Sequence, residues 1–440
     1  MPYWLLFVLL LLSGCTTHGK INNLDGLPPD GGYSYSFEKI REKASQDDFS
    51  VILAFSGGGT RAAAMSYGVL EALRDTRLTV GNQEIRLLDE VDVITSVSGG
   101  SFTAAYFGLY GDRIFTDYDK RFLRRDVSSE LLSRILSPGS WFSEDGRTET
   151  AIDYYEKVLF DGATFADLSR ADGPFIIINA SDLGAGIRFA FTQDYFSLLC
   201  SDIGNYPVAR AVTASSAVPV LFHPVVLQNY PGCEMAASPL LAVPENLEVS
   251  QQTRHLLDGL DSYADKEQRP YIHLVDGGIT DNLGLLALYE SVEAAGGIKE
   301  LLRDMGATSV ASKLIIISVN ASTRPQYEIE QSTRPPKLEQ LMGAVTDVQL
   351  HRYNAATIDL LRDALASWSR ELSADDKEVE HYFVELDFTQ VADLERRFFL
   401  NQIPTTFSLT DQQVDAAIEA GKELLLSNEE FLRFVSGLQS

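Results

Sequence analysis

A chain of 440 residues, 45% of them hydrophobic, is long enough to bury one large core or several smaller ones. It carries 62 acidic residues against 36 basic ones, which gives a formal net charge of -26 without any long run of Lys or Arg. Because this charge repels both a phosphate backbone and anionic lipid, we expect no nucleic-acid partner, and any membrane association has to come from apolar or covalent anchoring.

The N-terminus predicts a lipoprotein signal peptide over residues 1–14. Its apolar run from Trp4 to Leu12 is far shorter than the roughly 20 residues that span a membrane, and small residues and Cys15 follow it. The tetrapeptide LSGC resembles the bacterial lipobox, after which the cysteine is lipidated, although no Lys or Arg precedes the apolar run. An uncleaved apolar N-terminus is the alternative.

Residues 15–34 then form the lipidated cysteine and a Gly-, Pro- and Asn-rich segment without apolar periodicity, which predicts a flexible tether. Thr16 follows the cysteine directly, and a residue other than Asp at this position resembles the pattern of lipoproteins that are sent to the outer membrane. We therefore expect a lipid-anchored protein of the bacterial cell envelope, at the outer membrane.

Residues 35–325 predict one α/β domain. Helix-like segments alternate with short β-branched and apolar runs, which favours a mostly parallel central sheet with helices on both faces, in three layers. The expected strands are VILAF, VDVIT, FIIINA, YIHLV and LIIISV, at 51–55, 91–95, 175–180, 271–275 and 314–319.

The first predicted strand runs into a glycine-rich turn. Gly57, Gly58 and Gly59 let backbone N–H groups converge on an anion at a helix N-terminus, which suits a phosphate or the oxyanion of acyl transfer. The segment GGGTRA also fits the G-x-G-x-x-A fingerprint of dinucleotide-binding folds. An oxyanion loop, a dinucleotide site and mere close packing of strand and helix all stay open at this point.

The second predicted strand ends at Ser98, and Gly99 and Gly100 open a predicted helix. This strand–turn–helix context is the one required of a nucleophile elbow, which presents a serine hydroxyl on a strained turn. Gly100 is the small residue needed two positions later, whereas Ser96 stands where the G-x-S-x-G pattern has glycine. Ser98 is therefore the candidate nucleophile, and we expect Ser96 and Ser101 to bond to local backbone.

The best candidate for the base is Asp276, which follows the predicted strand over 271–275. Two glycines come after it, so the chain can turn away and leave the carboxylate at the edge where α/β sheets place their sites; an Asx turn is the alternative. None of the six histidines has the position expected of a base, but His351 and His381 follow Asp276 and keep a Ser-Asp-His order open. Asp281 precedes a predicted helix and is interpreted as its cap.

Beyond Cys15 the chain has two cysteines, Cys200 and Cys233, for which a disulfide and two free buried thiols are both open. Neither lies in a CxxC or His cluster, so no metal site is expected. Cys233 falls in a stretch over 226–270 that exceeds the usual length of a connection and predicts an insertion or lid.

The tail over 326–440 predicts a helical C-terminal extension packed on the body. Thr410 with Gln413 resembles a capping box, and the segment after it places apolar residues on one helical face.

The three motifs together resemble the patatin-like phospholipases. GGGTR at 57–61 is similar to the oxyanion motif of that family, SVSGG around Ser98 to its serine motif, and DGG at Asp276 to its aspartate motif, in the same order. INASDLGAGIRFAF at 178–191 and ASSAVPVLFHPV at 214–225 are also similar to family segments. The resemblance covers about residues 50–320 and, more loosely, the tail segment IPTTFSLTDQQVDAAIEAGKELL at 403–425.

The resemblance implies a serine lipid acyl hydrolase with a Ser-Asp dyad and no metal or cofactor. Ser98 would attack an ester of a membrane phospholipid or related lipid, Asp276 would take its proton, and the loop Gly57 to Gly59 would hold the oxyanion. Arg61 would fix that loop or lend it positive charge. A non-catalytic, lipid-anchored envelope binding protein, a Ser-His-Asp esterase and, more remotely, a dinucleotide-dependent oxidoreductase are the alternatives.

Overall fold

The computed structural model describes residues 19–27, 35–36, 48–80, 83–135, 146–219, 221–233, 249–307, 310–324, 333–373 and 378–439. The signal peptide over 1–14, the lipidation of Cys15 and most of the tether lie outside these residues and stay predictions, as does the part of the predicted insertion over 234–248.

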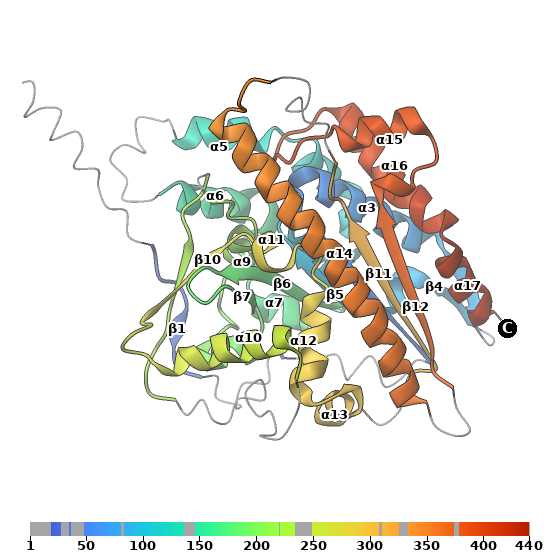
Figure 1. The fold of residues 1–440 in the computed structure, drawn as a ribbon, viewed down its shortest axis with the longest axis horizontal. Coiled ribbons are helices and arrows are strands. Elements are labelled where there is room, and N and C mark those ends of the chain that lie inside the picture. Colours follow the sequence, from blue (N-terminus) through green and yellow to red (C-terminus); the bar gives the residue numbers. More distant parts are fainter. Residues whose placement is uncertain are drawn as a thin grey trace, which may run out of the picture.

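An eight-stranded mixed sheet forms the centre of the molecule (Figure 1). Its order is β12-β11-β2-β5-β6-β10-β9, with β7 paired to β6, and the five strands from β12 to β6 run parallel. The strands are β2 (Phe49–Phe55), β5 (Val91–Val97), β6 (Phe175–Asp182), β7 (Ile187–Ala190), β9 (Val225–Gln228), β10 (Tyr271–Val275), β11 (Lys313–Asn320) and β12 (Glu380–Asp387). The prediction of a mostly parallel α/β sheet is confirmed.

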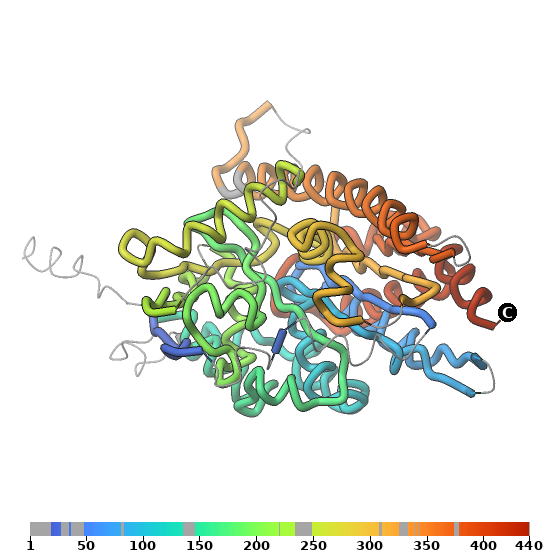
Figure 2. Tube along the Cα trace, turned by 90° about the horizontal axis from the view of Figure 1, so that it is seen from below, coloured from blue at the N-terminus to red at the C-terminus, as the bar shows by residue number. Residues whose placement is uncertain are grey.

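Helices cover both faces of this sheet, because its central strands are apolar on both sides. Leu53 and Phe55 of β2 belong to a large core with helices α3 (Gly59–Asp75), α4 (Gly99–Tyr110) and α16 (Asp411–Ser427). Ala54, between them, faces the opposite core under α12 (Leu286–Ala295) and α14 (Leu338–Leu372). Neighbouring residues of a strand point to opposite faces, so one strand serves both cores. In the perpendicular view, α14 runs along one edge of the molecule (Figure 2).

The other helices are α5 (Val127–Ile135), α6 (Arg147–Tyr155), α7 (Phe165–Arg170), α8 (Gln193–Leu198), α9 (Val208–Ser215), α10 (Gln251–Asp261), α11 (Gly278–Asp281), α13 (Ile298–Asp304), α15 (Leu394–Asn401) and α17 (Glu429–Leu438). Two small pairs, β1 (Leu24–Asp25) with β8 (Ser201–Asp202) and β3 (Arg77–Val80) with β4 (Gln83–Arg86), lie outside the central sheet. None of the helices in the described ranges is both long and apolar enough to cross a bilayer.

The expectation that YIHLV is a parallel strand is wrong, because β10 runs antiparallel to both of its neighbours, β6 and β9. β6 continues past the end of β5, and β10 pairs only with its last two residues, Ser181 and Asp182. Because β10 runs antiparallel to β6, its C-terminal end lies beside the C-terminal end of β5. Asp276 reaches the carboxyl edge of the parallel strands from the opposite direction.

The tail over 326–440 is not purely helical, which corrects that prediction. β12 pairs in parallel with all eight residues of β11 and forms the edge of the central sheet. The capping box at Thr410 is present, and α16 packs on α3 so closely that a Cβ at Gly68 would lie 2.0 Å from the carbonyl oxygen of Ile418. The tail thus completes the body, and a boundary at residue 325 would divide one sheet.

Cys200 and Cys233 form a disulfide across 33 residues of sequence. The bond ties the beginning of the predicted insertion over 226–270 to the turn after α8. Within that stretch the described residues form most of β9, the helix α10 and the segment that leads from α10 to β10. These parts therefore belong to the same domain as the central sheet.

Candidate active site

Ser98 occupies a strained turn between β5 and α4. Its φ of 48° and ψ of -119° lie in a region that residues with side chains rarely adopt. The two glycines after it explain the geometry: a Cβ at Gly99 would lie 2.0 Å from the carbonyl oxygen of Gly59, and one at Gly100 would lie 2.7 Å from the Cβ of Phe55. Helix and strand backbones meet here so closely that only glycine fits.

The Ser98 hydroxyl donates to the Oδ2 of Asp276 at 2.9 Å. The other carboxylate oxygen accepts from the backbone N–H of Gly278 at 2.8 Å, so Asp276 also forms the Asx turn that was its alternative role. Burial raises the pKa of Asp276 to about 6, against the hydrogen bonds from Gly278 and Ser98, which lower it. Among the described histidines, none is hydrogen-bonded to either residue, and His351 pairs with the carbonyl oxygen of Thr323.

Ser215, at the end of α9, fixes the turn at Ser98 through hydrogen bonds of its hydroxyl. Its hydroxyl accepts from the backbone N–H of Ser98 at 2.8 Å and donates to the carbonyl oxygen of Asn179 at 2.6 Å. Ser101 bonds to the same hydroxyl at 3.0 Å, and Ser96 donates to Ile177 on the neighbouring strand. The expectation that Ser96 and Ser101 bond to local backbone is therefore wrong, since both reach partners far along the chain.

The glycine loop offers two candidate oxyanion donors. The backbone N–H of Gly57 donates to the carbonyl oxygen of Asn282 at 3.0 Å, so it is already committed, contrary to the prediction. The N–H groups of Gly58 and Gly59 have no acceptor among the described residues. These two glycines have φ values of 138° and 60°, and a Cβ at Gly59 would lie 2.5 Å from the carbonyl oxygen of Thr406.

Arg61 ties this loop to the C-terminal part of the chain. Its buried guanidinium donates to the carbonyl oxygens of Ala321 and Ile403 and to the hydroxyl of Thr405, at 2.8, 2.5 and 3.0 Å. Burial lowers its pKa to about 10, although the charge of Asp347 raises it in part. All three acceptors are neutral, and two of them are backbone carbonyl oxygens, so of the two predicted roles the geometry favours fixing the loop.

A family model described as patatin-like phospholipase matches residues 53–289, more than half of the chain. The chain belongs to this family. The match includes Ser98, Asp276 and the glycine loop, and it confirms the resemblance found in the sequence.

Among solved structures, human GIVD cytosolic phospholipase A2 is similar, with a TM-score of 0.43 and 11% identity over 97% of this chain and 69% of that one. The same human protein in complex with methyl gamma-linolenyl fluorophosphonate gives a TM-score of 0.39 and 13% identity, over 94% and 64% of the two chains. A comparison with curated proteins finds no match.

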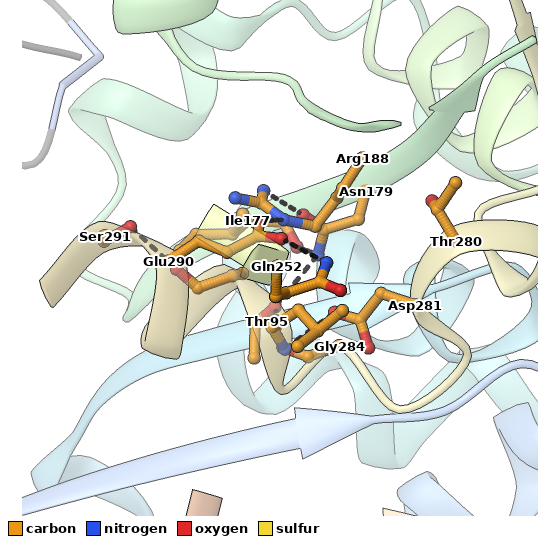
Figure 3. A network of polar contacts seen from close by, with 12 residues as sticks. Thr95, Ile177, Asn179, Arg188, Gln252, Thr280, Asp281, Gly284, Glu290 and Ser291 are labelled. Carbon is orange, nitrogen blue, oxygen red and sulfur yellow. Dashed lines mark hydrogen bonds and ion pairs between the residues drawn. The ribbon is translucent and has the colours of Figure 1, made fainter. Parts of the chain in front are cut away.

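A buried polar network of this patatin-like domain joins Asn179, Arg188 and Glu290 (Figure 3). Asn179 donates to the hydroxyl of Thr95 at 2.9 Å and accepts from Arg188 at 3.0 Å. Arg188 pairs with Glu290 at 2.8 Å, and Gln252 donates to the other oxygen of Glu290 at 3.1 Å. The network fixes Asn179, whose carbonyl oxygen positions Ser215 and, through it, Ser98.

Asp281 caps α12, as predicted, by accepting from the backbone N–H of Leu286 at 2.9 Å. It is fully buried, and burial raises its pKa to about 7, while the charge of Arg188 lowers it and that of Glu290 raises it. Asp281 thus lies close enough to Arg188 and Glu290 of this network to feel both charges.

A cavity of about 1350 Å³ opens over the dyad. Ser98, Asp276 and the glycine loop lie on its lining, and much of the remaining wall is apolar, including Leu131, Ile187, Phe222, Leu256 and Phe407. Within the part of the chain that the structure describes, no three His, Cys, Asp or Glu side chains are grouped to hold a metal ion.

Sequence reasoning missed three contributors to the patatin-like site: Ser215, Asn282 and Thr406. A Cβ built at Gly57 would lie 2.7 Å from the Oδ1 of Asn282 and 3.3 Å from the Cβ of Ser98, so the Asn282 amide borders the nucleophile. Ser215 lies inside the segment ASSAVPVLFHPV, and Asn282 follows the DGG motif by four residues. Thr406 lies in the tail segment at 403–425, whose looser resemblance to the family gave no role to any single residue.

Proposed function

We propose that this chain hydrolyses carboxylic esters of phospholipids or related lipids through a Ser98–Asp276 dyad and an acyl-enzyme intermediate. The observation that carries the proposal is the 2.9 Å hydrogen bond between the two side chains, with Ser98 on a strained elbow in the wall of a large cavity. Membership of the patatin-like phospholipase family supports a lipid ester as the substrate class.

In the first step, the Ser98 oxygen bonds to the ester carbonyl carbon while its proton passes to Asp276. A carboxyl with a pKa of about 6 is ionised at neutral pH and is a stronger base than an ordinary aspartate. The oxyanion is held by the N–H groups of Gly58 and Gly59, which have no acceptor among the described residues, and each is worth about 3 kcal/mol of transition-state stabilisation. The bond to the alcohol then breaks, and the leaving oxygen takes the proton from Asp276.

In the second step, water gives a proton to Asp276 and attacks the acyl carbon. The tetrahedral intermediate collapses, the bond to the serine oxygen breaks, and Ser98 recovers its proton from Asp276 as the fatty acid leaves. Because one carboxylate serves both halves of the reaction, no histidine is needed. The apolar wall gives an acyl chain a dry environment next to the nucleophile.

The cellular place of this activity is proposed from the sequence alone. A signal peptide over 1–14 and a lipidated Cys15 would hold the enzyme at the bacterial outer membrane, where lipid is present at high local concentration. Metabolic labelling with a fatty-acid analogue, compared between the natural chain and Cys15→Ser, tests the anchor directly: equal labelling would contradict it.

The catalytic proposal is tested by measuring fatty-acid release from a phospholipid by the natural protein, Ser98→Ala, Asp276→Asn and His351→Ala. We expect about a thousandfold loss or more in the first two variants and little change in the third. Collapse of activity in a correctly folded His351→Ala or His381→Ala would favour a Ser-His-Asp esterase. Absence of release by the natural protein across phospholipid and neutral esters would favour a non-catalytic binding protein.

A further inference from the structure

Exposed apolar side chains gather around the mouth of the cavity. Four of them line it and come from four separate parts of the chain: Leu132 of α5, Leu221 of the turn before β9, Ile279 of α11 and Val345 of α14. They are 56%, 60%, 53% and 54% exposed. We call these four residues the mouth rim. A contiguous patch of exposed apolar side chains marks an interaction site more often than single exposed apolar residues do.

The first half of α14 extends this rim. Leu338, Leu341 and Val348, here called the α14 stripe, are spaced three or four residues from Val345 or from one another, so all lie on one face of the helix. They are 76%, 46% and 55% exposed. In the second half of the same helix, the apolar residues Ile358, Leu361, Leu365 and Trp368 are buried against the body. With 3.6 residues per turn, the α14 stripe lies on the side of the helix roughly opposite to these buried residues, so it faces away from the body.

We propose that the mouth rim and the α14 stripe form a docking surface for a lipid bilayer or micelle, separate from the N-terminal anchor. This inference rests on the proposed function, since it identifies the substrate as lipid delivered from an aggregate. A protein seated on the rim would close the cavity. A lipid surface seated there would instead let an acyl chain pass from the bilayer to Ser98 along an apolar path.

Charge favours a zwitterionic or neutral surface as the occupant. Three arginines and three acidic residues line the cavity, so its wall offers no basic excess; they are Arg61, Arg147, Arg188, Asp276, Glu290 and Asp347. The whole chain carries a formal charge of -26, which repels anionic headgroups over the length of the electrical double layer. Binding must therefore come from apolar insertion, and we expect it to be insensitive to salt.

The test uses protein beginning at Gly19, which keeps every described contact and lacks the predicted anchor. Its binding to phosphatidylcholine vesicles is measured by sedimentation, together with turnover of a vesicle-borne ester and of a soluble short-chain ester. The docking variant is Leu341→Glu with Val348→Glu. The matched control is Leu426→Glu with Leu432→Glu, at side chains of α16 and α17 that are 43% and 50% exposed and line no part of the cavity.

We expect the docking variant to bind vesicles at least about tenfold more weakly and to lose vesicle turnover in proportion, while its turnover of the soluble ester stays unchanged. The control should match the unaltered protein in all three measurements. Equal vesicle binding by docking variant and unaltered protein would overturn the inference, as would an equal loss in the control.

Three further outcomes distinguish this inference from a dimer interface, from failure of the proposed function and from binding driven by charge. If the unaltered protein is a dimer that the docking variant converts to a monomer, the surface is an interface between copies and the inference is wrong. If the unaltered protein cleaves neither ester, the proposed function fails, whereas the vesicle binding still decides whether the surface docks on lipid. A strong preference for anionic vesicles would refute the charge argument.

Discussion

Replacing Asp276 with Asn removes a carboxylate whose pKa burial raises from 3.8 to about 6. The native state holds this proton more tightly than the unfolded state, so native stability falls as pH rises from about 4 through about 6, and the full penalty is present above that range. The difference in pKa corresponds to about 3 kcal/mol. Because the Asn carbonyl still accepts from Gly278 and its amide can donate to Ser98, we expect Asp276→Asn to be about 2 kcal/mol more stable at pH 8.

The assay is urea unfolding of the natural protein and Asp276→Asn at a series of pH values, with the disulfide intact. The difference in the free energy of unfolding between Asp276→Asn and the natural protein should be near zero at acid pH, grow through about pH 6 and then level off. Asp281, whose pKa burial raises to about 7, affects both proteins alike and cancels in the comparison. A gain that does not change with pH, or a less stable variant at pH 8, would refute the reasoning. The same variant should be inactive, which separates catalysis from stability.

Three further predictions concern the same structure. The kcat/KM of the natural protein should rise as pH passes through about 6, because the base must be ionised; a flat profile from pH 5 to 8 would contradict its assignment. Gly59→Ala should lose about a hundredfold in turnover, because its Cβ would lie 2.5 Å from a backbone oxygen, whereas Gly111→Ala, also at positive φ but in open space, should cost about 1 kcal/mol of stability and keep its activity. Cys200→Ser with Cys233→Ser should lower the free energy of unfolding by about 3 kcal/mol, since the bond closes a loop of 33 residues; an unchanged urea midpoint would argue against the bond.

Local patterns predicted most of the fold and the two central residues of the site. β5 and β6 are buried along their whole length, so they appear in the sequence as continuous apolar runs. The tight turn at Ser98 needs glycine at two positions, and this leaves a recognisable sequence. β12 was missed because it is an edge strand with only partial cover, and its alternating charged and apolar residues resemble the charged tail around it.

The remaining features depend on contacts between distant parts of the chain. Composition does not fix the direction of a strand, so nothing in YIHLV showed that β10 runs antiparallel. Whether the N–H of Gly57 is free depends on Asn282, more than 200 residues away. In the same way, Thr406 shapes the loop at Gly59 from the C-terminal region, whose sequence carries no catalytic motif.

The central claim is that Ser98 is the nucleophile, and covalent labelling tests it most directly. The natural protein is treated with a fluorophosphonate, and the adduct is located by peptide mass spectrometry, with Ser98→Ala and Ser101→Ala treated in parallel. We predict one adduct on Ser98 in the natural protein and none in Ser98→Ala. Ser101→Ala should still be labelled at Ser98, because the hydroxyl of Ser101 bonds to Ser215 and not to Asp276. An adduct on another residue, or unchanged labelling of Ser98→Ala, would contradict the assignment.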